Sequence, residues 1–443
     1  MVRLTPARLL CAASLLSTFF FLTFVTNLLH RRRGFDPFFE QPLPARPRPY
    51  STEVHYGEEC SPFKAGVMDD VTVVVKMGAG EEATQLPAYL ARMGRCQQDL
   101  LLFSDRKAEY DGWEIMDALG HLRPEYKYAN PDFDVYERMQ SATAGERSRE
   151  GWRLDKYKLL PMTELTWRER PNKNWFIFVE LDTYVNWDNM YRFLEHFDPD
   201  TPYFFGSPVW PRKKTVFGHG GSGIVLSRAA LNKIMSRGRM FAENHHTPGT
   251  HLFGEDMTKE CCGDEVLAKV LKKSGVSIRG YWPMFNGETP STVRYGGEQW
   301  CEAILTLHRM DSDDYASLER WESARRHPSK PLTFAELFTS IEPSLRERID
   351  DWTNLSDNVI RKGNHVSTKS FEACHAACMK DGKCIQYEHF GDTCRLSHII
   401  RLGHRQTPEG NIRWASGWMM NRMQAFKDAQ TQCSGAHFVH ANP

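Results

Sequence analysis

An uninterrupted apolar run at residues 175–179 ends in two acids, Glu180 and Asp182. Five consecutive apolar residues cannot alternate between core and solvent, so the run predicts a strand that is buried on both faces. In an open α/β sheet, ligands bind outside the carboxyl ends of the strands. Two carboxylates at that end suit Mg²⁺ or Mn²⁺ bridging a diphosphate. For an isolated Glu-x-Asp, however, a strand turning into a polar loop is the commoner explanation.

The segments around this strand alternate between strand and helix patterns. The expected strands are 71–76, 99–103, 175–179, 203–208, a short strand within 219–228, and 300–308. The expected helices are 85–95, 152–167, 228–235 and one whose first turn holds Asp264 and Glu265. This alternation is typical of βαβ units in a parallel sheet.

Three later features are candidate ligand contacts. The glycine-rich stretch from His219 to Gly223 permits close backbone approach to a ligand, although a tight turn is the simpler explanation. Asp264 and Glu265 begin a helix, where acids are also common because of the helix dipole. His308 ends an apolar run, and such a histidine is more often a packed core residue.

The size and charge of the chain limit its organisation and its partners. A length of 443 residues suggests two or three units, one of them large enough for a full α/β core. The 56 basic and 56 acidic residues give a formal net charge of zero. With no basic stripe interleaved with aromatic residues, nucleic acid is not an expected partner.

The N-terminal region predicts a membrane anchor. Residues 1–8 form a short tail, and residues 9–29 are an uncharged apolar run that as a helix spans roughly 30 Å, the thickness of a bilayer core. The run is longer than the apolar part of a typical signal peptide, and no small-x-small cleavage site follows it. Residues 30–60 are rich in proline and predict a semi-rigid stem.

The orientation of the anchor depends on two conflicting signals. Arginines after the span favour a cytoplasmic location for the long part of the chain. Ten of the eleven cysteines also follow the span, and the cluster Cys374, Cys378, Cys384 and Cys394 favours disulfides in an oxidising lumen over zinc. The sequon at Asn354 would be a usable glycan acceptor there. We therefore predict a single-pass type II protein of the Golgi or ER membrane, with its main domain in the lumen.

Three motifs in order resemble glycosyltransferase family 31, most closely its core 1 β-1,3-galactosyltransferase-like members. Glu180-Leu-Asp182-Thr-Tyr-Val stands where that family has Asp-Asp-Asp-Thr-Tyr-Val. Gly220-Gly-Ser-Gly-Ile-Val-Leu-Ser corresponds to its Gly-Gly-Ala-Gly-Tyr-Val-Leu-Ser, and Gly263-Asp-Glu-Val to its Glu-Asp-Val helix start. Glu180 and Gly263 depart from the family pattern. The resemblance implies an α/β fold of the GT-A type over 61–345, with a mixed, mostly parallel sheet flanked by helices.

The resemblance also implies a reaction and a set of roles. The expected activity is inverting transfer of a hexose, first of all galactose in a β-1,3 linkage, from a UDP-sugar to a glycan or glycoprotein. Asp182 and His308 would hold Mn²⁺, with Mg²⁺ as the alternative, and Asp264 would be the catalytic base, with Asp256 and Glu265 as alternates. Glu180 would lie outside the metal ligands or contact the ribose. The remaining positions expected at the nucleotide are Lys76, Asp105, Lys156, Gly221, Ser222 and Gly223.

Residues 350–435 resemble a PAN/apple module, a small disulfide-rich α+β unit. The resemblance rests on Cys374-x₃-Cys378-x₅-Cys384, followed by Tyr387 and by Cys394-Arg-Leu. It implies bridges from Cys374 to Cys394 and from Cys378 to Cys384, and it leaves the partner of Cys433 open.

Two functional classes follow from these observations. The first is a lumenal glycosyltransferase, and the second is a catalytically inactive, membrane-tethered protein that binds carbohydrate or protein through the module. The departures at Glu180 and Gly263 support the second, whereas retention of both Asp182 and His308 favours the first. Homodimer formation is left open.

Overall fold

The computed structural model describes residues 60–438, except residues 94, 95, 98, 123–126, 128, 129, 142–149, 213, 246–259, 326–329, 431, 432 and 434. The predicted tail, the anchor at 9–29 and almost all of the stem at 30–60 lie outside the described residues. Within the described part, no helix combines the length and apolarity needed to cross a bilayer.

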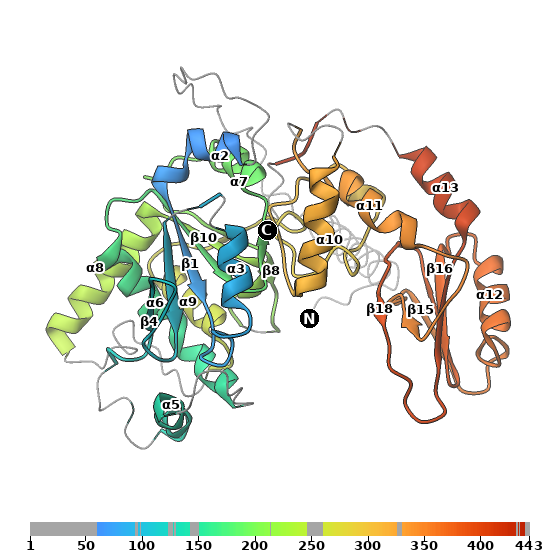
Figure 1. Ribbon diagram of the computed structural model, residues 1–443, viewed down its shortest axis with the longest axis horizontal. Helices are drawn as coiled ribbons and strands as arrows, with labels where there is room; N and C mark the ends of the chain where they lie inside the picture. Colours follow the sequence, from blue (N-terminus) through green and yellow to red (C-terminus); the bar gives the residue numbers. More distant parts are fainter. Residues whose placement is uncertain are drawn as a thin grey trace, which may run out of the picture. The chain divides into compact units, whose positions relative to one another are not determined.

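The larger sheet of the molecule has eight strands in the order β11-β7-β10-β5-β1-β2-β4-β3 (Figure 1). The strands are β1 (Val71–Lys76), β2 (Leu100–Ser104), β3 (Ala108–Tyr110), β4 (Trp113–Asp117), β5 (Trp175–Glu180), β7 (Phe204–Gly206), β10 (Ile224–Ser227) and β11 (Ile278–Gly280). Strands β5, β1, β2 and β4 run parallel, as do β7 and β11. Strand β10 is antiparallel to both of its neighbours, and β3 is antiparallel to β4. The predicted mixed α/β sheet is confirmed.

Both faces of β5 are covered, as its apolar run predicts. Phe176 and Phe178 belong to a buried core that also contains Leu159 and Val266. These two residues come from α6 (Asp155–Glu169) and α9 (Gly263–Lys273), and α8 (Arg228–His245) packs against both helices. On the other face, Trp175 stacks on Phe205, which meets an aromatic ring of α7 (Trp187–Leu194).

Shorter elements complete this part of the chain. The helices are α2 (Ser61–Gly66), α3 (Leu86–Met93), α5 (Asp132–Ser141), α10 (Ser312–Ser323) and α11 (Phe334–Ile341). The short strands are β6 (Tyr184–Val185), β8 (Pro208–Val209), β9 (Phe217–Gly218) and β12 (Thr306–Leu307).

The predicted strand at 300–308 is wrong in extent. Only Thr306–Leu307 form a strand, β12, which pairs antiparallel with β6. The preceding Ala303 makes only a single bridge to Thr333, and Ile304 is buried among apolar residues of α10 and α11. An apolar run identifies buried backbone, but it does not distinguish a strand from an irregular segment inside a core.

The C-terminal part forms a second, antiparallel sheet, drawn in orange and red in Figure 1. Its order is β13-β19-β16-β17-β15, and α12 packs on β16. The elements are β13 (Ile349–Asp350), β14 (Trp352–Thr353), β15 (Val359–Lys362), α12 (Phe371–Lys380), β16 (Gln386–Phe390), β17 (Thr393–Ser397), β18 (His404–Arg405), β19 (Trp414–Trp418) and α13 (Met420–Ala429). The predicted α+β module is therefore present, and its likeness to PAN/apple modules stays a prediction.

Disulfides connect α12 to the sheet and close two further loops. Cys374 pairs with Cys394 and Cys378 with Cys384, which confirms the expected connectivity. Cys433, whose partner was open, pairs with Cys301, and Cys60 pairs with Cys96.

The prediction that Asn354 is a usable glycan acceptor is wrong for the folded protein. Its side chain is fully buried. Its amide donates to the carbonyl oxygens of Tyr387 and Gly417, and its Oδ1 accepts from the hydroxyl of Ser356. Because a glycosylated asparagine must reach solvent, this one serves to join the strands of the module.

Candidate functional site

The carboxyl end of β5 brings two acids and a histidine together. The Nε2 atom of His308 lies 3.1 Å from Oδ1 of Asp182 and 3.4 Å from Oε2 of Glu180. One ligand atom from each side chain falls within 4.8 Å of the others. The predicted meeting of Asp182 and His308 is thus confirmed, and Glu180 joins them.

Two backbone features bring His308 to the acids. Pairing of β12 with β6 places it beside the loop after β5, and the amide of Met310 donates to the carbonyl of Asp182. On the other side of the imidazole lies the backbone of Gly221. A Cβ on that glycine would stand 2.2 Å from Cε1 of His308, so only glycine fits.

The glycine-rich loop is itself tied to β5 and β12. The hydroxyl of Thr183 donates to the carbonyl of Gly221, and the hydroxyl of Thr306 donates to that of Ser222. Gly223 has a φ of 84°, which favours glycine. The predicted contacts Gly221, Ser222 and Gly223 therefore form one wall of the site.

The charges of the cluster reinforce one another. Burial opposes the ionised form of Glu180, but Lys76, 2.8 Å away, and His308 outweigh burial and hold the pKa of that carboxyl well below its usual range. Burial likewise opposes the charge on His308, but Asp182 and Glu180 raise its pKa to about 9. The protein without a metal thus holds a protonated imidazole between two carboxylates at neutral pH.

The donor set fits a divalent cation. Neither ring nitrogen of His308 makes a hydrogen bond of good geometry within the described residues, although both acids approach Nε2. Two carboxylates and an imidazole suit Mn²⁺, and Mg²⁺ accepts the carboxylates. Asp182 and His308 can hold the ion, and Glu180 is placed to join them.

Asp264, the predicted base, faces the same site from the first turn of α9. Its Oδ2 accepts the amide of Gly220 at 2.8 Å. Desolvation raises the pKa of Asp264, although Lys76 and the Gly220 amide oppose the shift. A raised pKa makes a carboxylate a better proton acceptor.

The departure at Gly263 has a steric reason. A Cβ there would lie 3.0 Å from the backbone oxygen of Asp155 and 3.3 Å from the side chain of Leu159. Glycine lets α9 begin directly against α6, whereas a larger residue would require these neighbours to shift by a few tenths of an ångström. Of the alternate bases, Glu265 instead contacts Cys261 and Lys214, and Asp256 lies outside the described residues.

The other predicted nucleotide contacts divide into two groups. Lys76 lies in the site, paired with Glu180 and 3.6 Å from Asp155. Asp105, in contrast, is fully buried, and its Oδ1 accepts the amide of Ala79. Because no part of its carboxylate is exposed, Asp105 fixes the loop after β1 and is not placed to touch a nucleotide directly.

Lys156 is also placed differently from the prediction. Its ammonium pairs with Asp132 at 2.9 Å, in a cluster with Arg153 and Tyr157. The described ion pairs of Lys156 thus do not include the acids of the candidate site.

Sequence reasoning missed residues that support the site. Lys158 is fully buried and pairs with Asp155 at 2.9 Å and with Asp105 at 3.3 Å. His219 accepts the amide of Ser222, and its ring lies 5.5 Å from that of His308. The signal for Lys158 in the sequence was its spacing of three residues from Asp155 on a predicted helix. The signal for His219 was its position directly before the glycines.

Comparison with known proteins finds a family match in the part of the chain that holds the candidate site. Residues 153–275, which hold the acids of β5, the glycine-rich loop and the start of α9, match the Fringe-like family. This segment is similar to Fringe-like domains. The resemblance to glycosyltransferase family 31 is thereby confirmed for the segment.

Two other similarities concern single proteins. Over 73 residues, 16% of this chain, the sequence is 37% identical to glycoprotein-N-acetylgalactosamine 3-beta-galactosyltransferase 1 of Xenopus laevis. The match spans about a fifth of that relative, 20% of its length. A crystal structure of a glycosyltransferase involved in the glycosylation of the major capsid of PBCV-1 aligns with 56% of this chain and 98% of its own, with 10% identity and a TM-score of 0.26.

Proposed function

We propose that this chain is a glycosyltransferase that transfers a hexose, first of all galactose in a β-1,3 linkage, from a UDP-sugar to a glycan or glycoprotein. The observation that carries the proposal is the convergence of Asp182, His308 and Glu180 beside the glycine-rich loop, with Asp264 of α9 accepting a hydrogen bond from the same loop. The similarity to Fringe-like domains and the galactosyltransferase relative support the choice of reaction and sugar.

Each residue has a distinct task in this proposal. Asp182 and His308, joined by Glu180, would hold Mn²⁺ or Mg²⁺. When bound, such an ion would supply positive charge to stabilise a diphosphate leaving group. Asp264 accepts the proton of the attacking acceptor hydroxyl, so one in-line displacement inverts the anomeric configuration. Lys76 holds Glu180 ionised, and Gly221 lets the loop approach His308.

A transfer assay with the purified full chain tests the proposal. The chain is incubated with a panel of UDP-sugars and simple glycan acceptors, with and without Mn²⁺, and products are identified by mass and anomeric configuration. We expect an acceptor that gains one β-linked hexose only when the metal is present. No transfer with any donor and acceptor would instead favour the catalytically inactive binding protein.

We further propose that the chain is a single-pass type II protein of the Golgi or ER membrane with this domain in the lumen. The apolar run at 9–29 and the four disulfides support this location. Alkylation of the unreduced protein from its native source should leave the eight paired cysteines unmodified. Their modification would place the domain in the cytoplasm.

A further inference from the structure

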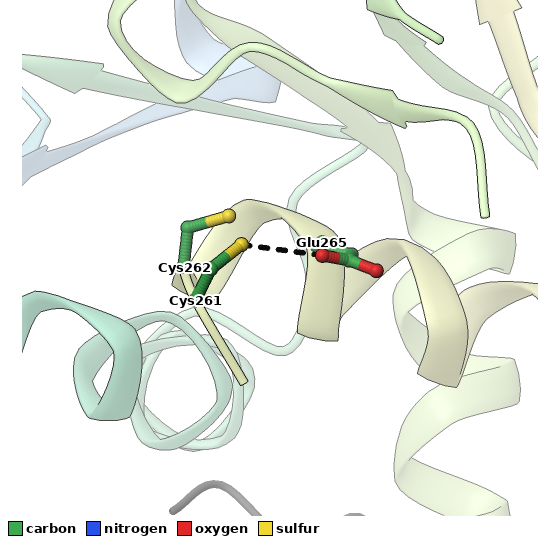
Figure 2. Close-up of side chains that lie close together, drawn as sticks. All are labelled: Cys261, Cys262 and Glu265. Carbon is green, nitrogen blue, oxygen red and sulfur yellow. Dashed lines mark hydrogen bonds between the residues drawn. The ribbon is translucent and has the colours of Figure 1, made fainter. Parts of the chain in front are cut away.

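Two neighbouring cysteines at the start of α9 remain thiols. The other eight described cysteines are paired, whereas Cys261 and Cys262 are free. Figure 2 shows both sulfur atoms on the same side as the carboxylate of Glu265, which follows one helical turn later. The Sγ of Cys261 lies 3.2 Å from Oε2 of Glu265, and one ligand atom from each of the three residues falls within 4.8 Å of the others.

We propose that Cys261, Cys262 and Glu265 bind a thiophilic divalent cation, of which Zn²⁺ is the best match. Tetrahedral Zn²⁺ takes sulfur at about 2.3 Å and carboxylate oxygen at about 2.0–2.2 Å, so neighbouring ligand atoms stand roughly 3.3–3.8 Å apart. The spacing of the three side chains needs only small rotamer changes to reach that geometry. Three protein ligands leave the fourth position to water.

The carboxylate of Glu265 is held in place beside the two thiols. Glu265 is 1% exposed, and its Oε2 accepts hydrogen bonds from Cys261 and Lys214. The ammonium group of Lys269 lies 3.4 Å from Oε1. Burial and these partners fix the carboxylate in position next to both sulfurs, where it can share a cation with them.

Charge balance also permits the ion. Without a metal, one carboxylate and two lysines stand beside two neutral thiols. A divalent cation that replaces the two thiol protons leaves the total charge of the cluster unchanged. The donor sulfurs select a different metal from the oxygen and nitrogen donors of Asp182 and His308, because thiolates favour Zn²⁺ over Mn²⁺ or Mg²⁺.

The site has a structural consequence that does not depend on the proposed function. The three ligands enclose the first turn of α9, and Asp264 lies between Cys262 and Glu265 in the sequence. A bound ion would therefore fix the start of the helix that carries Asp264 to Gly220.

Cobalt titration of the full chain tests the proposal. In a Cys11→Ser background, Cys261 and Cys262 supply the free thiols of the described region. The metal-stripped protein should bind one equivalent of Co²⁺ with a thiolate charge-transfer band, and Zn²⁺ should displace it. Cobalt at Asp182 and His308 gives no such band because that site holds no sulfur. Cys261→Ser and Cys262→Ser should each lose about half of the band.

Carboxylate variants provide the matched comparison. Glu265→Gln should weaken Co²⁺ binding by about tenfold or more, because it removes a ligand. Glu260→Gln should not, since Glu260 pairs with Lys269 but is not among the three ligands. Should a variant not fold, alkylation of the thiols of Cys11→Ser with and without Zn²⁺ gives the same answer, because bound zinc should protect both.

Two results would overturn the proposal. The first is a pair of freely alkylated thiols that yields no charge-transfer band with Co²⁺ and no protection by Zn²⁺. The second is an unreduced protein whose mass is two hydrogens below that expected for four disulfides. That mass would show that an oxidant such as glutathione disulfide has joined Cys261 and Cys262 in a fifth disulfide. Neither result depends on sugar transfer, so failure here is distinguishable from failure of the proposed function.

Discussion

At the scale of single residues, Asp264 and Asp182 are both acids of the site but have different surroundings. Asp264 accepts a backbone amide and is set apart from His308 by the glycine-rich loop, whereas Asp182 contacts His308 directly. Asp264→Asn keeps size and hydrogen bonding but removes the proton acceptor, so turnover should fall by roughly 10²–10⁴ while donor binding is unchanged. Steady-state kinetics and donor titration measure the two effects.

Asp313→Asn is the matched control for Asp264→Asn. Asp313 is an exposed acid in the first turn of α10, so its replacement should leave turnover unaltered. Full activity in Asp264→Asn would move the role of base to another acid, first of all Asp256.

The protonated imidazole of His308 makes metal binding depend on pH. The pKa of His308 is raised to about 9 in the metal-free protein, and only the neutral ring binds a metal. Each ion bound below that pH must release one proton, so the apparent Mn²⁺ affinity should rise about tenfold per pH unit from pH 6.5 and level off near 9. Calorimetric titrations in buffers of different ionisation enthalpy detect the proton. A flat profile between pH 6.5 and 8 would show that His308 is not a ligand.

At the scale of elements, the glycine-rich loop must lie directly against His308. Gly221→Ala would place a methyl group 2.2 Å from Cε1 of that ring, so the imidazole or the loop must move. We expect Mn²⁺ affinity to fall by about tenfold or more with the fold retained. Gly382→Ala, where a Cβ meets nothing within 4 Å, is the matched control. Equal metal affinity in both variants would show that the glycine-rich loop does not position His308 for metal binding.

Helix α6 stabilises the site through the buried Lys158. Lys158→Met would leave the fully buried Asp105 without its ammonium partner, which should cost about 3–5 kcal/mol in the free energy of unfolding. Lys107→Met removes a lysine that is 76% exposed and paired with Glu114, so its cost should stay below about 1 kcal/mol. Denaturant unfolding of the two variants measures the difference, and equal costs would mean that the buried pair contributes little.

Local pattern predicts some of these elements well and others poorly. The apolar run at 175–179 correctly predicted a central strand that is buried on both faces. The apolar run at 300–308 did not predict a full strand correctly, because an apolar segment can be buried without pairing to a neighbouring strand. Lys158 was missed because Asp155 and Lys158, three positions apart on a helix, resemble an exposed ion pair.

At the scale of the whole molecule, the long-range contacts were accessible from sequence only through family resemblance. The pairing of Asp182 with His308 and the connectivity of the module's disulfides came from that resemblance and are confirmed. The Cys301–Cys433 bridge and the burial of Asn354 came from the tertiary structure alone. A sequon specifies a chemical acceptor, but the exposure of its asparagine depends on residues far along the chain.

The central claim is that Asp182, His308 and Glu180 hold a metal through which a nucleotide diphosphate binds. The most direct test is calorimetric titration of UDP into the full chain, with and without Mn²⁺, for the wild type and for Asp182→Asn. We predict that Mn²⁺ tightens UDP binding to the wild type by about tenfold or more and that Asp182→Asn loses this gain. Equal UDP affinity with and without the metal, or an undiminished gain in Asp182→Asn, would contradict the account.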